Sequence, residues 1–200
     1  MHMLYGSSSS ASVGSIWLLS RRWINSAFRP WIISSHSDGV ISTPSFIKKV
    51  GQYTLNEYIN LNELDFEKHS DCTLIDDNAF IFSNYLKRAF IPRKVTKIGS
   101  YCFSDCKSLK KIDFEENSSL QIIETMAFRR TALTCFLIPE KVIKIGNYAF
   151  SDCINLQIVE INDESKLKII DSKVFDRSPN ILLMISSNLK EKLFVIWSTF

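Results

Sequence analysis

Histidine is scarce in this sequence. The three histidines are His2, His36 and His69, so none lies between residues 70 and 200. Histidine is the most frequent general acid and base in enzymes, so a histidine-based active site in that part of the chain is excluded. His69 and Cys72 match no known catalytic signature. Since no other reactive groups converge in the sequence, we predict that the chain is not an enzyme.

Long apolar runs and an excess of one charge are also missing. No apolar stretch approaches the roughly 18 residues that a membrane-spanning helix needs. The 24 basic and 21 acidic residues are interspersed and leave a net charge of +3. Such a small charge does not favour nucleic acid as a partner. With 46% apolar residues, a chain of 200 residues can bury one sizeable core.

The cysteines and acidic residues give little support for a bound metal. Five cysteines are an odd number and do not indicate a disulfide framework, which leaves the compartment open between cell surface and cytoplasm. The spacing of Cys102 and Cys106 is weak evidence for zinc, and the glycine-aspartate repeat of calcium-binding solenoids is absent. We expect no metal and no cofactor. Cys106 and Cys153 are predicted to be small core residues that stay reduced and unreactive.

What the sequence does contain is an internal repeat. Residues 91–128 and 138–175 align without a gap, and 18 of their 38 positions are identical. Self-similarity at a fixed period is the signature of a repeat architecture. A degenerate copy of the same pattern is recognisable from Val40 onward, as expected for a terminal repeat. At the other end, Ile181–Ile185 resembles the strand of a further repeat.

A shorter unit of 22 to 25 residues lies inside this repeat. Each copy has an aromatic residue, with an isoleucine five positions before it and a small residue three positions after it. The aromatic residues are Phe80, Phe103, Phe128, Phe150 and Phe175. The isoleucines are Ile75, Ile98, Ile123, Ile145 and Ile170, and the small residues are Ser83, Cys106, Thr131, Cys153 and Ser178. We predict that both the aromatic and the isoleucine positions are buried.

Each short unit divides into a strand and a second piece. Two apolar residues that lie two apart, such as Ile112 and Phe114, have the period of a strand with one buried face. The segment from Ile98 to Cys106 has the apolar spacing of one face of a short helix. One strand per unit requires parallel strands joined by crossovers. We therefore predict an α/β fold: a right-handed coil with a parallel sheet on one face and short helices or turns on the other.

At this point the pattern resembles the BspA-like leucine-rich repeat family. Its motif reads Leu-x-x-Ile-x-Ile-Pro-x-x-Val-x-x-Ile-Gly-x-x-Ala-Phe-x-x-Cys. The chain matches that motif at Ile138-Pro139, Val142, Ile145-Gly146, Ala149-Phe150 and Cys153. The resemblance covers roughly residues 40–185 and departs from the motif at the missing prolines after Phe114 and Ile161. It implies a leucine-rich-repeat solenoid that acts as a non-enzymatic, often surface-exposed recognition module.

The two ends of the chain differ from the repeats. Residues 1–37 hold eleven serines and no acidic residue, and we expect residues 1–39 to form a disordered tail. A targeting segment, or a basic amphipathic helix over residues 16–30 that lies on a membrane, is the alternative. The leucine-rich-repeat domain is predicted to span residues 40–187 with about six repeats. Residues 188–200 are predicted to form a C-terminal cap or a truncated repeat.

Strand residues that alternate with the buried ones are predicted to form an exposed face with two rows. One row runs from Glu63 to Leu183 and the other from Asp65 to Ile185. Several of these residues are apolar, which is typical of an interface. We predict that a protein or peptide partner binds there, with surface adhesion or a structural role as the alternative function. The predicted contact residues are Arg88, Phe90, Lys111, Asp113, Leu137, Ile158 and Glu160.

Overall fold

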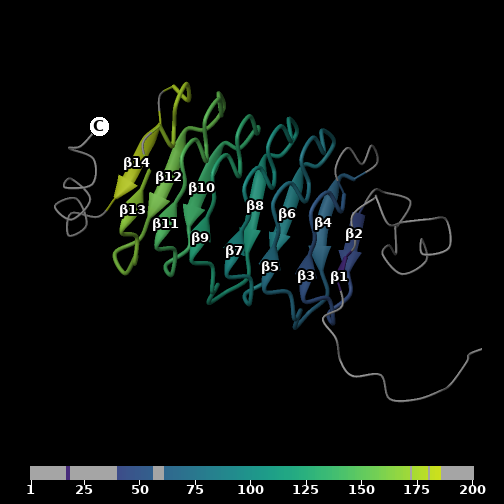
Figure 1. Ribbon diagram of the computed structural model, residues 1–200. Helices are drawn as coiled ribbons and strands as arrows, with labels where there is room; N and C mark the ends of the chain where they lie inside the picture. Colours follow the sequence, from purple (N-terminus) through teal and green to yellow (C-terminus); the bar gives the residue numbers. More distant parts are fainter. Residues whose placement is uncertain (1–16, 19–39, 56–60, 172, 180, 186–200) are drawn as a thin grey trace, which may run out of the picture.

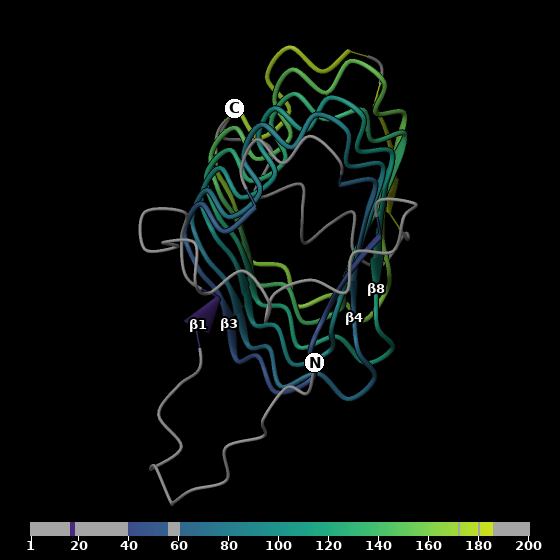
Figure 2. The same cartoon turned by 90° about the vertical axis from the view of Figure 1, so that its right-hand side faces the viewer.

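A computed structural model describes residues 17–18, 40–55, 61–171, 173–179 and 181–185. The chain winds as a solenoid of about six coils, and the view along its axis shows successive coils stacked on one another (Figures 1 and 2). Each coil contributes one strand of four residues and one of two residues, all paired in parallel. The predicted parallel solenoid is therefore confirmed.

The four-residue strands form what we call the long-strand wall. In most of these strands buried and more exposed residues alternate, as in the strand from Cys135 to Ile138, so one face covers the core and the other faces outward. Proline follows three of the strands, including those that end at Ile91 and Ile138. Proline has no backbone N–H to donate to the hydrogen-bond ladder of a sheet, so it marks the ends of these strands. The strands are β2 (Val40–Thr43), β4 (Glu63–Phe66), β6 (Arg88–Ile91), β8 (Lys111–Phe114), β10 (Cys135–Ile138), β12 (Ile158–Ile161) and β14 (Leu182–Ile185).

The two-residue strands form a second sheet, the short-strand wall, in which seven strands pair without interruption. A sheet on one face alone was predicted, and this second wall was not. The second residue of these strands is the recurring isoleucine or valine of the repeat, which is buried in β3, β5, β7, β9, β11 and β13. The strands are β1 (Trp17–Leu18), β3 (Lys49–Val50), β5 (Leu74–Ile75), β7 (Lys97–Ile98), β9 (Ile122–Ile123), β11 (Lys144–Ile145) and β13 (Ile169–Ile170).

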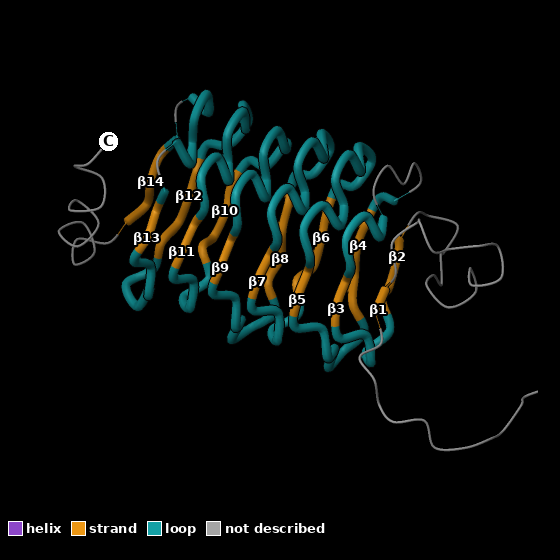
Figure 3. Tube along the Cα trace, viewed as in Figure 1, coloured by secondary structure: helices purple, strands orange, loops and turns teal. Residues whose placement is uncertain are grey.

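No helix occurs in the part of the chain that the structure describes, so the prediction of short helices is wrong and the alternative, turns, is what the coils contain (Figure 3). After Ile98 the chain makes consecutive turns in which Tyr101 and Asp105 have φ angles of 55° and 60°. A left-handed residue reverses the chain locally and stops a helix from propagating. These turns leave Ile98, Cys102 and Cys106 buried, which is why their spacing resembled one helical face.

The phenylalanines of the repeat form one column through the core. Consecutive rings are stacked with centroid distances of 5.0, 5.5, 5.4 and 5.7 Å from Phe80 to Phe175. Phe80, Phe103, Phe128 and Phe150 are fully buried, and Phe175 is partly buried against the same core. The predicted aromatic positions of the core are thus confirmed, although the last ring is less covered than expected.

Glycine and acidic residues alternate along the solenoid directly after the buried isoleucine or valine. A Cβ atom on Gly99 would lie 2.4 Å from the backbone nitrogen of Asp77, and one on Gly146 would lie 2.6 Å from that of Thr125. Both distances are shorter than a Cβ atom tolerates, so these two glycines permit close stacking on the preceding coil. The glycines are Gly51, Gly99 and Gly146, and they alternate with Asp76, Glu124 and Asp171.

The acidic residue of each alternate coil pairs with a lysine of the coil before it. The Lys49–Asp76 pair has a nitrogen–oxygen distance of 2.6 Å, and the Lys97–Glu124 pair one of 3.0 Å. The 47-residue period of the sequence is therefore a pair of coils. One coil of the pair contains the lysine and the glycine, and the next contains the acidic residue that pairs with that lysine.

The predictions for the ends of the chain fall largely outside the described residues. Only Trp17–Leu18 of the N-terminal segment is described, and it forms β1, which pairs in parallel with β3. At these two residues the helical interpretation of residues 16–30 is wrong. The remainder of residues 1–39, with its expected disorder and membrane contact, and the expected cap over residues 188–200 lie outside the described part.

The phenylalanine column predicts a large effect of Phe150→Ala. Phe150 is fully buried between the rings of Phe128 and Phe175, so truncation leaves a cavity and removes both ring contacts. We expect the free energy of unfolding to fall by about 3–5 kcal/mol. Denaturant titration followed by circular dichroism measures this change. A loss below about 1 kcal/mol would contradict the assigned core position.

The glycine alternation predicts that Gly146→Ala is destabilising although it adds only one methyl group. The new Cβ atom meets backbone rather than a flexible side chain, and the coils must separate locally. We expect a loss of about 1–3 kcal/mol in the free energy of unfolding. Glu124→Ala in the neighbouring coil is the matched control, because its pair with Lys97 is partly exposed and such pairs contribute up to about 1 kcal/mol. Equal effects of the two substitutions would show that close stacking is not what Gly146 provides.

Candidate functional site

The outer face of the long-strand wall carries all seven residues that the sequence predicted as contacts. The register pairs Arg88 with Lys111 and Phe90 with Asp113 across β6 and β8. It pairs Leu137 with Glu160 across β10 and β12. Ile158 lies opposite Cys135 in the same pair of strands. The two predicted rows are therefore present in the described strands from β4 to β12.

The part of this face on β4, β6 and β8 is mainly charged. The Asp113 carboxylate accepts a hydrogen bond from Arg88 Nε at 2.6 Å and is 2.8 Å from Lys111 Nζ. Partial burial alone would raise the pKa of Asp113, but the hydrogen bonds from Lys111 and Arg88 outweigh it and place this pKa below its ordinary value. The hydrogen bond to Asp113 raises the pKa of Arg88, with smaller contributions from Glu63 and Asp65.

The part of the face on β10, β12 and β14 is mainly apolar. Leu137 is 54% exposed, Leu182 is 61% exposed and Met184 is 50% exposed. Ile158 lies between Cys135 and Leu182 in one row, and Glu160 lies between Leu137 and Met184 in the other. Four apolar side chains thus surround one exposed carboxylate on three neighbouring strands. Grouped exposed apolar side chains of this kind are typical of an interface.

Leu182 and Met184 were missed by sequence reasoning, which assigned the last strand's outer positions to Leu183 and Ile185. The register pairs Ile158 with Leu182 and Glu160 with Met184, so that assignment is wrong by one residue. The physical reason is that the last coil has one residue fewer between its phenylalanine and its strand than the coil before it. Because every residue from 181 to 185 is apolar, no alternation of polar and apolar residues could reveal the phase.

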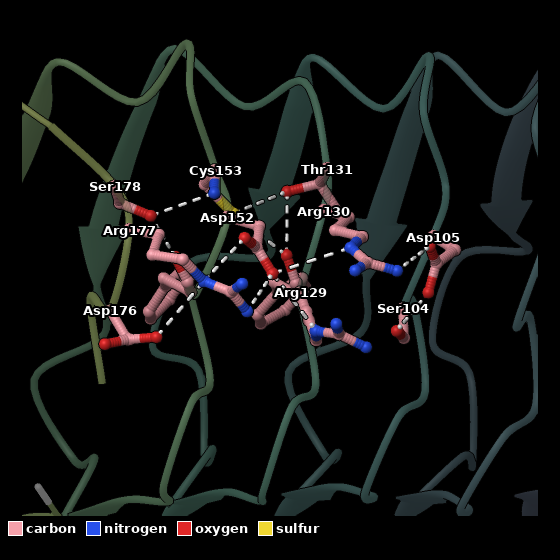
Figure 4. Close-up of polar contacts among 12 residues, drawn as sticks. Ser104, Asp105, Arg129, Arg130, Thr131, Asp152, Cys153, Asp176, Arg177 and Ser178 are labelled. Carbon is pink, nitrogen blue, oxygen red and sulfur yellow. Dashed lines mark hydrogen bonds and ion pairs between the residues drawn. The ribbon is translucent and has the colours of Figure 1, made fainter. Parts of the chain in front are cut away.

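A second cluster of charges lies at the turns beside the phenylalanine column (Figure 4). The Asp152 carboxylate is 3.3 Å from Arg129 Nε, 3.5 Å from Arg130 Nε and 3.1 Å from Arg177 Nε. Asp105 and Asp176 pair with Arg130 and Arg177 in turn. Three guanidinium groups are therefore matched by three carboxylates. This cluster connects neighbouring coils and leaves no surplus charge to bind a separate ion.

Reactive groups do not converge in the described part of the chain. No group of three histidine, cysteine or acidic side chains there could hold a metal ion. Within the same residues no helix is long and apolar enough to cross a bilayer. His69 is exposed in the loop after β4. Cys72, three residues later in the sequence, is buried. Burial raises the pKa of the Cys72 thiol to about 11.

The small residue three positions after four of the five phenylalanines stabilises the stack of coils. Ser83 Oγ donates to the Leu55 carbonyl at 2.8 Å, and Cys106 Sγ donates to the Phe80 carbonyl at 3.2 Å. Cys153 Sγ donates to the Phe128 carbonyl at 3.1 Å. Each bond runs from one coil to the coil before it. The predicted burial of Cys102, Cys106 and Cys153 is confirmed.

Six copies of the BspA type leucine rich repeat region match this chain, over residues 35–157 and 73–194. The chain belongs to the BspA type leucine-rich repeat family. The resemblance that the repeat motif indicated is therefore confirmed. No curated protein sequence matches the chain at a significant level.

Solved structures of other leucine-rich repeat proteins share the fold. A leucine-rich repeat protein from Bacteroides ovatus has a TM-score of 0.59 at 24% identity, and the alignment covers 74% of this chain and 45% of that protein. The leucine-rich repeat protein of T. pallidum has a TM-score of 0.55 at 22% identity, with 72% of this chain and 63% of that protein covered. The chain thus spans about half to two thirds of the length of these proteins.

Thiol labelling of the folded protein is expected to modify Cys135 first. Cys135 is exposed on the outer face, whereas Cys72, Cys102, Cys106 and Cys153 are buried. Burial raises the pKa of all four buried thiols, and the thiolate is the reactive form. Intact-mass analysis with an alkylating reagent under mildly alkaline conditions should therefore give one rapid modification per chain. The variant Cys135→Ser should give none, and rapid labelling of a second thiol would contradict the assigned burial.

Proposed function

We propose that this chain is a non-enzymatic recognition module that binds a protein or peptide through the outer face of its long-strand wall. The observation that carries the proposal is the apolar group formed by Leu137, Ile158, Leu182 and Met184 on β10, β12 and β14. Three of these side chains are at least half exposed. Water contact with such a group is unfavourable, and covering it with a partner's apolar side chains removes that cost.

The two parts of the face have different roles in this proposal. The apolar part supplies most of the affinity, because desolvated apolar contacts dominate typical interfaces. Glu160, exposed among apolar neighbours, pairs with a lysine or arginine of the partner. The charged part around Arg88, Lys111 and Asp113 sets orientation and association rate.

The charges of the outer face favour a polypeptide over nucleic acid. Four acidic residues lie on it, and only two basic ones, Arg88 and Lys111, accompany them in the described strands from β4 to β12. Both basic residues already contact Asp113. A phosphate backbone requires a continuous stripe of unpaired lysine or arginine. A partner with apolar side chains and a basic residue fits the face instead.

A peptide-display selection tests the proposal and needs no identified partner. Peptides that bind the chain are selected from a random library, and their dissociation constants are measured for the native chain and for two double variants. Phe90→Ala with Leu137→Ala truncates one side chain on each part of the face. Leu137→Ala with Leu182→Ala truncates two side chains of the apolar part.

We expect each double variant to weaken binding by more than about 2 kcal/mol, roughly 30-fold in the dissociation constant, with an unchanged circular dichroism spectrum. Ile154→Ala is the matched control, because Ile154 is 71% exposed but belongs to a turn outside the long strands. Lys107→Ala and Asn155→Ala serve as further controls, since these residues belong to turns as well. Loss of binding in these turn variants, with no effect of the double variants, would place the binding surface elsewhere.

A further inference from the structure

The long-strand wall is divided into two sheets, and the short-strand wall is not. β2, β4, β6 and β8 form one sheet, and β10, β12 and β14 form another, with no pairing between β8 and β10. On the opposite wall β7, β9 and β11 pair without interruption across the same level of the solenoid. We call the boundary between β8 and β10 the seam; both strands are labelled in Figure 1.

A missing residue in one turn coincides with the seam. Cys106 and Leu109 occupy the small and apolar positions of one coil, and Cys153 and Leu156 those of another, with two residues between them in each case. In the intervening coil, Thr131 and Leu133 have only Ala132 between them. The longer turns close with a hydrogen bond from the Leu109 amide to the Cys106 carbonyl and from the Leu156 amide to the Cys153 carbonyl. In the shortened turn no such bond joins the Leu133 amide to the Thr131 carbonyl.

The hydrogen bond that joins successive coils at the start of the long strands is also missing at the seam. Before it, the Lys110 amide donates to the Lys87 carbonyl at 2.9 Å, and after it the Gln157 amide donates to the Thr134 carbonyl at 2.9 Å. Among the described residues no equivalent bond joins Thr134 to Lys110. The Thr131 hydroxyl donates to the Phe128 carbonyl of its own coil at 2.9 Å. The cysteines at this position instead donate to the preceding coil.

The core beneath the seam is less covered than elsewhere. Ile112 and Phe114 of β8 are only partly buried, whereas the inward residues Phe136 and Ile138 of β10 are buried. An edge-to-face contact spans the seam, with the ring centroids of Phe114 and Phe136 5.7 Å apart. Aromatic contacts of this kind are favourable, but they do not impose the fixed geometry of a hydrogen-bonded ladder.

We propose that the seam is a hinge built into the solenoid. The coils on its two sides stay joined through the short-strand wall and through hydrogen bonds at the turns, such as that from the Phe103 amide to the Ala127 carbonyl. The two sheets of the long-strand wall separate and approach as two bodies. The line of continuous pairing through β7 and β9 is the axis, because those backbone hydrogen bonds would break last. Opening breaks no ladder bond between β8 and β10. It removes the apolar contacts of Ile112 and Phe114 and bends the backbone hydrogen bonds that join the same two coils at the turns.

The hinge divides the outer face at the boundary of its two parts. The charged part lies on the sheet that ends with β8, and the apolar part lies on the sheet that begins with β10. In terms of the proposed function, on which this one consequence rests, a partner that spans both parts fixes the angle between them. The hinge itself rests on the backbone geometry and does not depend on any partner.

Hydrogen exchange of the unliganded protein tests the hinge directly. In a parallel sheet, successive amides point to opposite neighbours, so alternate amides of β8 and β10 face the seam. We expect these amides to exchange at least about 100-fold faster than those of β6 and β12, through local opening. Uniform protection across β6, β8, β10 and β12 would overturn the proposal.

Restoring the missing residue tests the cause. One asparagine inserted between Ala132 and Leu133 recreates the spacing of Cys153 and Leu156. We expect the seam-facing amides of β8 and β10 to become as slow as those of β12. The matched control inserts one asparagine between Asn155 and Leu156, where the turn is already complete, and should lower protection in β12. Unchanged fast exchange in a folded restored variant would overturn the shortened turn as the cause of the hinge.

Distance measurements keep the test decisive if the inserted variant does not fold. In a Cys135→Ser background, spin labels on Arg88→Cys and Ile158→Cys report across the seam. Labels on Glu63→Cys and Lys111→Cys report within one sheet, and the remaining native cysteines are buried. We expect a clearly broader distance distribution across the seam than within the sheet. Equal widths for the two pairs would show that the solenoid moves as one body and would refute the hinge.

Discussion

The stacking of five phenylalanine rings is the interaction on which the remaining structure depends. Their centroids are 5.0–5.7 Å apart, close to the roughly 4.8 Å between neighbouring strands. One ring per coil therefore sets the rise that both walls share.

The ring column also explains why the turns are so constrained. Tyr101 and Asp105 have positive φ angles on either side of Phe103, and bringing the chain into the core and out again within five residues requires this conformation. Such residues cost about 1–3 kcal/mol each, which the buried aromatic side chains offset.

Much of this fold is readable in the sequence, because burial repeats in phase. The phenylalanines, the isoleucines five residues before them and the alternating core residues from β4 to β12 were predicted correctly, except that Ile112, Phe114 and Phe175 are only partly buried. The helical interpretation failed because Ile98, Cys102 and Cys106 are spaced alike in a helix and in two successive left-handed turns. Non-glycine residues at the positive φ positions gave no compositional warning. The outward residues of β14 were predicted wrongly for a different reason. Every residue of this strand is apolar, so its sequence does not show which residues face the core and which face outward. Of the seven predicted contact residues, all lie on the outer face, but whether they bind a partner depends on chemistry outside this chain.

The outer face and the seam follow from the same property of a solenoid. Each coil contacts only its neighbours, so a local change in one turn has a local effect on pairing. One wall is interrupted at the coil that has one residue fewer between Thr131 and Leu133, and the second wall and the phenylalanine column continue there. The change of surface from charged to apolar occurs at that same boundary. In a globular domain with one shared core, a deletion of one residue would disturb many contacts. Here the two sheets on either side of the shortened turn each keep their own strand register.

The alternation of glycine and acidic coils limits how such a protein can grow in evolution. Gly99 and Gly146 each lie against the backbone of an acidic coil, and each acidic residue reaches back to the lysine of a glycine coil. Duplicating a single acidic coil would set a Cβ atom against backbone where only glycine fits, and would leave one carboxylate without its lysine. Duplicating two coils together preserves both contacts. Viable changes in array length are therefore expected in even numbers of coils, and an engineered extension should be cut and joined at intervals of about 47 residues, the offset of Ile91 and Ile138.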